Sequence, residues 1–148
     1  MNTEAKLTPV REAHRFDEAA LARYLSVELY GFCKPFSILQ FEGGQSNPTF
    51  LLDCGDHKFV LRKKPPGKLL PSAHQVDREY RVMKALEHSD VPVPRMYLLC
   101  EDETVIGTIF FVMEYVDGVD LSRVIKDRGA LPIADACDYV RQAAIGLQ

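Results

Sequence analysis

Five short stretches of the chain have patterns typical of β-strands, with apolar and polar residues in rough alternation or in short apolar runs. The stretches cover 36–42, 49–54, 57–63, 95–101 and 108–114. The connections between the first three are too short for a crossover helix, so we expect those strands to pair antiparallel. The pattern therefore predicts a small antiparallel sheet of five strands.

Helical spacing of apolar residues occurs in four other parts of the chain. Asp17 can cap a helix that ends near Gly31, and a capping-box spacing opens the most regular helical stretch, 72–86. Asp120 can cap a short helix, and apolar residues then recur at helical spacing over 133–147. We expect one helix inserted between the third and fourth strands, and a last helix whose apolar stripe has little in the chain to cover it.

Composition and charge narrow the class of protein. The chain has 148 residues, 47% of them hydrophobic and 26% charged, which is enough for one ordinary core. Its net charge of −3 gives no overall electrostatic footprint for nucleic acid or an anionic membrane, so any anion site must be local. The longest uncharged stretch in the second half, 104–113, has 10 residues, far fewer than the roughly 20 of a membrane helix.

Two further features favour the cytoplasm. The N-terminal residues lack the apolar core and the cleavage pattern of a secretory signal. The four cysteines, at positions 33, 54, 100 and 137, have spacings that match neither a disulfide framework nor paired metal ligands. We therefore expect a cytoplasmic protein with reduced thiols and no membrane span.

The loop between the first two strands is suited to approach a phosphate group. Gly43 and Gly44 carry no side chain that would block the approach, and Ser46 and Asn47 add small polar donors. By itself, such a loop more often forms an ordinary hairpin turn. Neither the Walker phosphate loop nor the Rossmann glycine spacing is present in the sequence.

A charged pair beside this loop would strengthen the phosphate interpretation. Arg62 shares a strand face with Val60, where its guanidinium could hold two phosphate oxygens. Glu79 projects into the apolar arc of the helix over 72–86, and a carboxylate there favours a cationic partner such as Arg62. A solvated Arg62 and a partly exposed Glu79 without a partner are the simpler alternatives.

The stretch 110–118 is an apolar strand that continues into a short polar link. Between two lobes, such a link leaves main-chain donors and acceptors unpaired, and these can bind the edge of an adenine ring. Without that context, the pattern indicates only the end of a strand.

In this order, the glycine loop, the strand with Arg62, the glutamate helix and the link over 113–116 resemble the small lobe of the protein-kinase-like fold. More narrowly, the blocks 43–50, 60–67 and 73–80 resemble the aminoglycoside phosphotransferase-like family. The resemblance is strongest to the branch that is fused to acyl-CoA dehydrogenases in animals. It runs from about residue 16 to the last residue, and the three blocks agree in both sequence and spacing.

The resemblance implies an α+β fold in three parts. We expect an N-terminal helical segment over 1–35 and a nucleotide-binding small lobe over 36–116, with a five-stranded antiparallel sheet and one inserted helix. The hinge and the first helices of a truncated large lobe would occupy 117–148. The family's His-Gly-Asp catalytic loop and its metal-binding aspartate would lie beyond residue 148, since none of the four histidines begins that motif. The resemblance thus assigns no catalytic residue and no metal ligand to this chain.

The family's activity is the transfer of a phosphoryl group from ATP to a hydroxyl group. The resemblance implies ATP as the cofactor, with Mg²⁺ held by the missing lobe. The acceptor in the full-length protein would be a small-molecule hydroxyl, or a hydroxyacyl thioester in the dehydrogenase-linked branch. The nucleotide-binding residues that it implies are Gly43, Gly44, Ser46, Asn47, Phe50, Val60, Arg62, Glu79, Met113, Glu114 and Val116.

Each of these residues takes a role from the resemblance. At the phosphates, Ser46 and Asn47 would contact oxygens beside the glycines. Arg62 would hold the α and β phosphates, and Glu79 would orient Arg62.

At the base, Val60 and Phe50 would form the ceiling over the adenine, and Met113 would close the back of the pocket. The carbonyl of Glu114 and the amide of Val116 would bind the adenine edge.

Two other interpretations remain open at this point. A non-catalytic binding or interaction module with the same fold could use the exposed last helix to bind a partner or to self-associate. Nucleic-acid binding through Arg62, Lys63, Lys64 and Lys68 is weakly supported, because these clustered charges lack interleaved aromatic residues. We therefore expect the ATP-binding part of a small-molecule phosphotransferase, inactive alone, that binds neither nucleic acid nor membrane.

Overall fold

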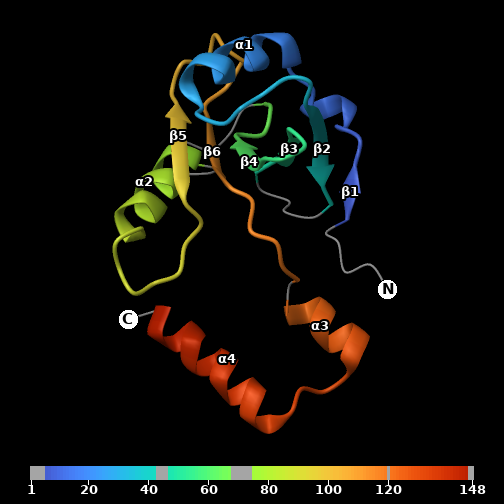
Figure 1. The fold of residues 1–148 in the computed structure, drawn as a ribbon, viewed down its shortest axis with the longest axis vertical. Helices are drawn as coiled ribbons and strands as arrows, with labels where there is room; N and C mark the ends of the chain where they lie inside the picture. Colours follow the sequence, from blue (N-terminus) through green and yellow to red (C-terminus); the bar gives the residue numbers. More distant parts are fainter. Residues whose placement is uncertain (1–5, 43–46, 68–74, 120, 147–148) are drawn as a thin grey trace.

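The computed structural model describes residues 6–42, 47–67, 75–119 and 121–146 (Figure 1). Within these ranges, the strands form one antiparallel sheet in the order β1-β2-β3-β4-β6-β5. The strands are β1 (Leu7–Thr8), β2 (Ser37–Phe41), β3 (Thr49–Asp53), β4 (Lys58–Lys63), β5 (Met96–Cys100) and β6 (Phe110–Glu114). The five expected strands are all present.

The edge strand β1 adds a sixth, which the sequence pattern did not predict. It has only two residues, Leu7 and Thr8, which pair with Phe41 and Gln40 of β2. A two-residue strand is too short to produce a recognisable alternation of apolar and polar positions.

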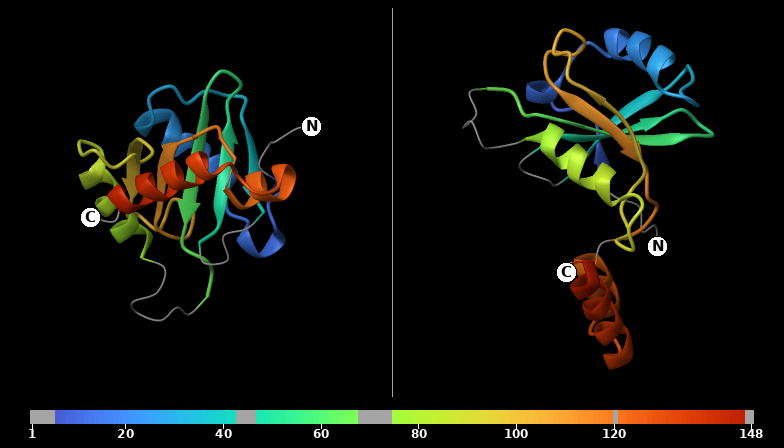
Figure 2. Two further views of the ribbon diagram at one scale, coloured as in Figure 1. Left: turned by 90° about the horizontal axis from the view of Figure 1, so that it is seen from below. Right: turned by 90° about the vertical axis from the view of Figure 1, so that its left-hand side faces the viewer.

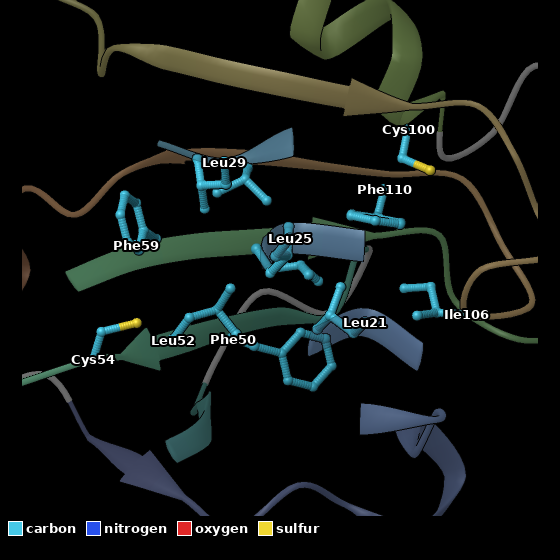
Figure 3. Packing of buried hydrophobic residues seen from close by; sticks show 12 residues of the cluster. Leu21, Leu25, Leu29, Phe50, Leu52, Cys54, Phe59, Cys100, Ile106 and Phe110 are labelled. Atoms are coloured by element: carbon cyan, nitrogen blue, oxygen red, sulfur yellow. The ribbon is translucent and has the colours of Figure 1, made fainter. Parts of the chain in front are cut away.

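One face of the sheet is covered by α1 (Glu18–Glu28), as Figures 1 and 2 show. Asp17 caps this helix as expected, because its Oδ1 accepts a hydrogen bond of 2.8 Å from the Ala20 amide. The buried leucines of α1 pack against inward-facing side chains of β3, β4 and β6, labelled in Figure 3. The N-terminal helix therefore shares one hydrophobic core with the sheet.

The opposite face is covered in part by α2 (Val76–Leu86), the inserted helix, which packs on β5 and β6 (Figure 2). Val76 is fully buried against Phe111 of β6. The helix begins at Val76, with Gln75 in the N-cap position. Ser72, the first residue of the expected capping box, lies outside the described residues.

Strand β4 presents different residues to the two faces. Phe59 and Leu61 point into the core beneath α1, whereas Val60 and Arg62 belong to the face that α2 covers. Thr49 of β3 lies directly opposite Arg62 in the strand register and therefore points the same way. Strand alternation thus places Arg62 on the side of the inserted helix.

The chain before α1 is anchored to the sheet by a buried glutamine. Gln40 of β2 accepts a hydrogen bond of 3.0 Å from the Arg11 amide, and its Nε2 lies 2.8 Å from Nδ1 of His14. These contacts hold the short 3₁₀ helix η1 (Glu12–His14) against the same end of the sheet as β1.

After β6, the chain forms α3 (Leu121–Arg128) and α4 (Ile133–Gly146), which lie apart from the sheet (Figures 1 and 2). Both helices were expected, although Asp120, the expected cap of the first, lies outside the described residues. The apolar stripe of α4 is exposed, with Ile133 at 83% and Val140 at 69% of full exposure. In the part of the chain that the structure describes, no helix is long and apolar enough to span a bilayer.

Candidate functional site

Arg62 and Glu79 form an ion pair between β4 and α2. The Arg62 Nε donates a hydrogen bond of 3.1 Å to Oε2 of Glu79, and both side chains keep partial contact with solvent. The pairing predicted from the sequence is therefore present. Because partly exposed ion pairs contribute little to stability, its main effect is to fix the direction of the guanidinium.

A threonine holds the other side of the same guanidinium. Arg62 Nη1 donates to Oγ1 of Thr49 at 3.3 Å, and Thr49 Oγ1 in turn donates to the Asn47 carbonyl at 3.1 Å. These contacts use only part of the donors that an arginine carries. Its remaining N–H groups have no acceptor among the described residues, so they can bind a ligand.

A cavity of about 250 Å³ lies next to Thr49 on this face of the sheet. Its lining comes from β2, β3, β4, β6 and the two links beside them: Phe41, Thr49, Val60, Pro94, Met113, Glu114, Tyr115, Val116 and Gly118. Val60 and Met113 are direct neighbours in the register of β4 and β6. The cavity wall is therefore built mainly from side chains that strand alternation points away from α1.

The link after β6 is held in place at its start and open further on. The Glu114 amide donates to the Arg95 carbonyl at 2.8 Å, and the Glu114 carboxylate accepts a hydrogen bond of 3.0 Å from the Arg95 amide. Two residues later, the amide of Val116 has no acceptor within the described residues. A main-chain donor is thus available in the lining of the cavity.

The structure brings most of the expected site residues together. Val60, Met113, Glu114 and Val116 line the cavity. Thr49 is also in the lining, and it connects the cavity to Arg62, Glu79 and the buried Asn47 through the hydrogen bonds described above. Three expected residues of the glycine loop, Gly43, Gly44 and Ser46, lie outside the described residues.

The expectation for Phe50 requires a correction. Its side chain is fully buried on the α1 face, where its ring meets Phe16 edge to face at 5.4 Å between centroids. The reason is the two-residue period of β3, which points Phe50 toward α1 and its neighbour Thr49 toward the cavity. Phe50 therefore supports the sheet from behind and does not line the cavity.

Sequence reasoning missed other residues of the lining, chiefly Phe41, Thr49 and Pro94. Alternation along their own strands separates Thr49 from Phe50 and Phe41 from Gln40, so the sequence does indicate that each faces away from its neighbour. The pairing register that brings them to the same cavity cannot be found in one strand alone. Pro94 reaches the site only through the path of the chain before β5.

Two features of this structure define a small lobe of the kinase-like class. The first is an arginine–glutamate pair between the sheet and its inserted helix, and the second is a cavity beside the link that follows β6. Residues 37–147 match the model of the phosphotransferase enzyme family. The chain belongs to that family.

Solved and curated relatives agree with this assignment. The chain is 48% identical, with a TM-score of 0.61, to a crystal structure from Ralstonia eutropha assigned as an aminoglycoside phosphotransferase, over 70% of this chain and 29% of that one. It is 51% identical over 120 residues to the Arabidopsis thaliana protein named Probable acyl-CoA dehydrogenase IBR3, covering 76% of this chain. It is 49% identical over 131 residues to acyl-CoA dehydrogenase family member 11 of Gallus gallus, covering 86% of this chain. The matches span only 15% and 16% of those two curated relatives.

Proposed function

We propose that this chain is the nucleotide-binding part of an ATP-dependent phosphotransferase. The observation that carries the proposal is the position of the Arg62–Glu79 pair next to an apolar cavity. Thr49 connects the two, because it lines the cavity and accepts a hydrogen bond from Arg62. The same cavity has an open main-chain donor. A cavity for a flat base next to a fixed cation for phosphates is the combination that ATP requires.

At the base, Val60 and Met113 provide apolar surface for an adenine ring. The Val116 amide would donate to the ring edge, and the Glu114 carbonyl would accept from it. The link is held in place at Glu114, which supports its role in binding the adenine edge. Main-chain groups that are already held in position lower the entropic cost of binding.

At the phosphates, Arg62 would hold the α and β groups with the donors that Glu79 and Thr49 leave unused. Glu79 would act as a positioning residue for Arg62. Asn47, with Gly43, Gly44 and Ser46, would complete the phosphate end of the site.

The acceptor would be a hydroxyl group on a small molecule. In the branch linked to acyl-CoA dehydrogenases, a hydroxyacyl thioester is the acceptor that we propose. This part of the proposal is supported by the names of the two curated relatives described above, both of which refer to acyl-CoA dehydrogenases.

This chain alone would not transfer phosphate. Phosphoryl transfer needs a group that orients the acceptor hydroxyl and carboxylates that hold Mg²⁺. The printed sequence has no His-Gly-Asp motif, and the described residues contain no cluster of three or more His, Cys, Asp or Glu that could hold a metal ion. The proposal therefore assigns binding and orientation of ATP to these residues, and no catalytic step.

The proposal also includes the cytoplasm as the compartment. All four cysteines are free thiols in the structure, which suits a reducing environment.

A titration with Mg-ATP tests the proposal. Binding is measured by calorimetry and by the shifts of the chain's backbone amide resonances. We expect weak, saturable binding that shifts the amide resonances of Val116 and Glu114. The variant Arg62→Ala should weaken binding by about 10- to 100-fold, since charge-assisted hydrogen bonds to phosphate are lost.

Arg81→Ala is the matched control. Arg81 lies on α2 and also forms ion pairs with carboxylates, but it contacts Asp77 and Glu101 rather than the site. It should bind Mg-ATP like the wild type. Equal and negligible binding by wild type and Arg62→Ala would contradict the proposal and would favour a non-catalytic module that uses the exposed face of α4.

A further inference from the structure

A second cavity, of about 430 Å³, opens away from the candidate ATP site. It is formed where η1, the end of β4 and the connection between β5 and β6 meet, and it shares no lining residue with the first cavity. Its charged lining residues are Arg15, Lys63, Lys64 and Glu103.

Lys63 is the buried member of this group. It follows Arg62 on β4, so strand alternation points it to the opposite face of the sheet. Only 4% of the residue is exposed, and its Nζ lies 5.6 Å from the centroid of the Phe16 ring. Neither a hydrogen bond nor an ion pair is formed by this ammonium group among the described residues.

A buried ammonium group without an anion is unfavourable. Removal of its water is costly, and a cation–π contact offsets only part of that cost. Burial accordingly lowers the pKa of Lys63. The group is not sealed, however, because the described residues contain no fully enclosed side-chain nitrogen or oxygen without a partner. The ammonium group therefore keeps some contact with solvent, and Lys63 is one of the residues that line the cavity.

The rest of the cavity supplies more positive charge than negative. Arg15 and Lys64 also line it, and neither forms an ion pair within the described part of the chain. Among the described residues of the lining, Glu103 is the single acidic one, so these residues together carry a formal charge of about +2. The Thr108 hydroxyl adds a neutral donor.

We propose that this cavity binds a small dianion, a phosphate group carried by an organic molecule, with Lys63 as its buried anchor. The net positive charge matches a phosphate monoester better than a single carboxylate. The volume also exceeds what one phosphate group fills, which leaves room for an organic part against Ile106 and the stem of Lys63. Lys63 and Arg62 would then hold anions on opposite faces of the same strand.

Amide resonances of the full 148-residue chain, titrated with phenyl phosphate, test the site. We expect saturable shifts at Lys64, Gly107 and Thr108, with the amides of Glu114 and Val116 unaffected. Inorganic phosphate should shift the same resonances with weaker affinity, and equal affinity would contradict the organic part of the proposed ligand. Shifts confined to the candidate ATP site, or no saturable shift, would overturn the proposal.

Variants separate the anchor from general surface charge. Lys63→Met keeps the length of the side chain, removes its charge and should weaken phenyl phosphate binding at least tenfold. Lys126→Met is the matched control, since Lys126 is an exposed lysine of α3 outside the cavity, and it should bind like the wild type. If Lys63→Met does not fold, the double variant Arg15→Gln/Lys64→Gln tests the same cavity from exposed or half-buried positions.

Two results would count against the anchor role. Wild-type affinity in Lys63→Met or in the double variant would show that the cavity charge does not bind the anion. Equal affinity for benzoate and phenyl phosphate would show that the site does not select a dianion.

Discussion

Arg62 and Lys63 are neighbouring cations on β4, but their side chains lie on opposite faces of the sheet and have different surroundings. Arg62 lies at a partly open face, where Glu79 pairs with its charge and Thr49 fixes its direction. Lys63 lies at the face of α1, where 96% of it is buried over the Phe16 ring without a carboxylate. A charge that keeps both solvent and a counter-ion can be preorganised at little cost, whereas a buried charge without one lowers stability until an anion binds.

The same contrast applies to the uncharged residues of β4. Leu61 is fully buried in the core beneath α1, while Val60 lines the candidate ATP cavity. Leu61→Ala should lower the free energy of unfolding by about 2 to 5 kcal/mol, because it leaves a cavity in close-packed surroundings. Val60→Ala should cost less, since one side of Val60 already faces an open cavity. Urea denaturation of both variants measures the difference, and equal losses would erase the distinction between the faces.

Replacement of the buried ammonium group of Lys63 should increase stability, in contrast to the loss expected for Leu61→Ala. Lys63→Met should raise the free energy of unfolding in phosphate-free buffer by about 1 kcal/mol or more, because an apolar side chain of similar length has no charge to desolvate. Arg62→Met should change stability by less than about 1 kcal/mol and in the unfavourable direction. A loss of stability in Lys63→Met would mean that the ammonium has compensation beyond the Phe16 contact.

Loss of the carboxylate that holds Arg62 should affect binding more than stability. Glu79→Gln keeps the shape of the side chain and removes the charge that orients the guanidinium. We expect Mg-ATP binding about tenfold weaker, with the urea midpoint nearly unchanged. Rescue of binding by Glu79→Asp would support a positioning role, and a large drop in stability with unchanged binding would contradict it.

The smallest effect concerns the carboxylate at the other end of α2. The hydrogen bond from Lys84 Nζ, and then that from the Met96 amide, hold the pKa of the Glu87 carboxyl below its usual 4.5. A lowered pKa in the folded state contributes stability above pH 4.5, and this contribution is lost as the pH falls through the folded-state pKa. The unfolding difference between wild type and Glu87→Gln should therefore shrink as the solution is acidified.

Much of the fold could be predicted from local patterns. Asp17 caps α1 where its position before a helical stripe indicated, and the Arg62–Glu79 pair follows from two local facts, strand alternation and the apolar arc of a helix. The two-residue β1 was not predicted, because it exists only through its pairing with β2. Phe50 lies on the face opposite to the one that the resemblance implies, because strand alternation separates it from Thr49.

The cavities depend on information that no single segment contains. The first needs the register that aligns Thr49 with Arg62 and Val60 with Met113, together with the course of the chain at Pro94. The second needs η1 beside the end of β4, a contact between segments some fifty residues apart.

The sequence by itself determined which residues alternate, where α1 begins and which family the chain resembles, because these depend on periodicity and composition over short distances. The tertiary structure decided which face each strand residue occupies relative to α1 and α2, and thus which of two adjacent cations receives a carboxylate. Burial is the physical reason, because it is a property of the assembled layers and of no isolated strand.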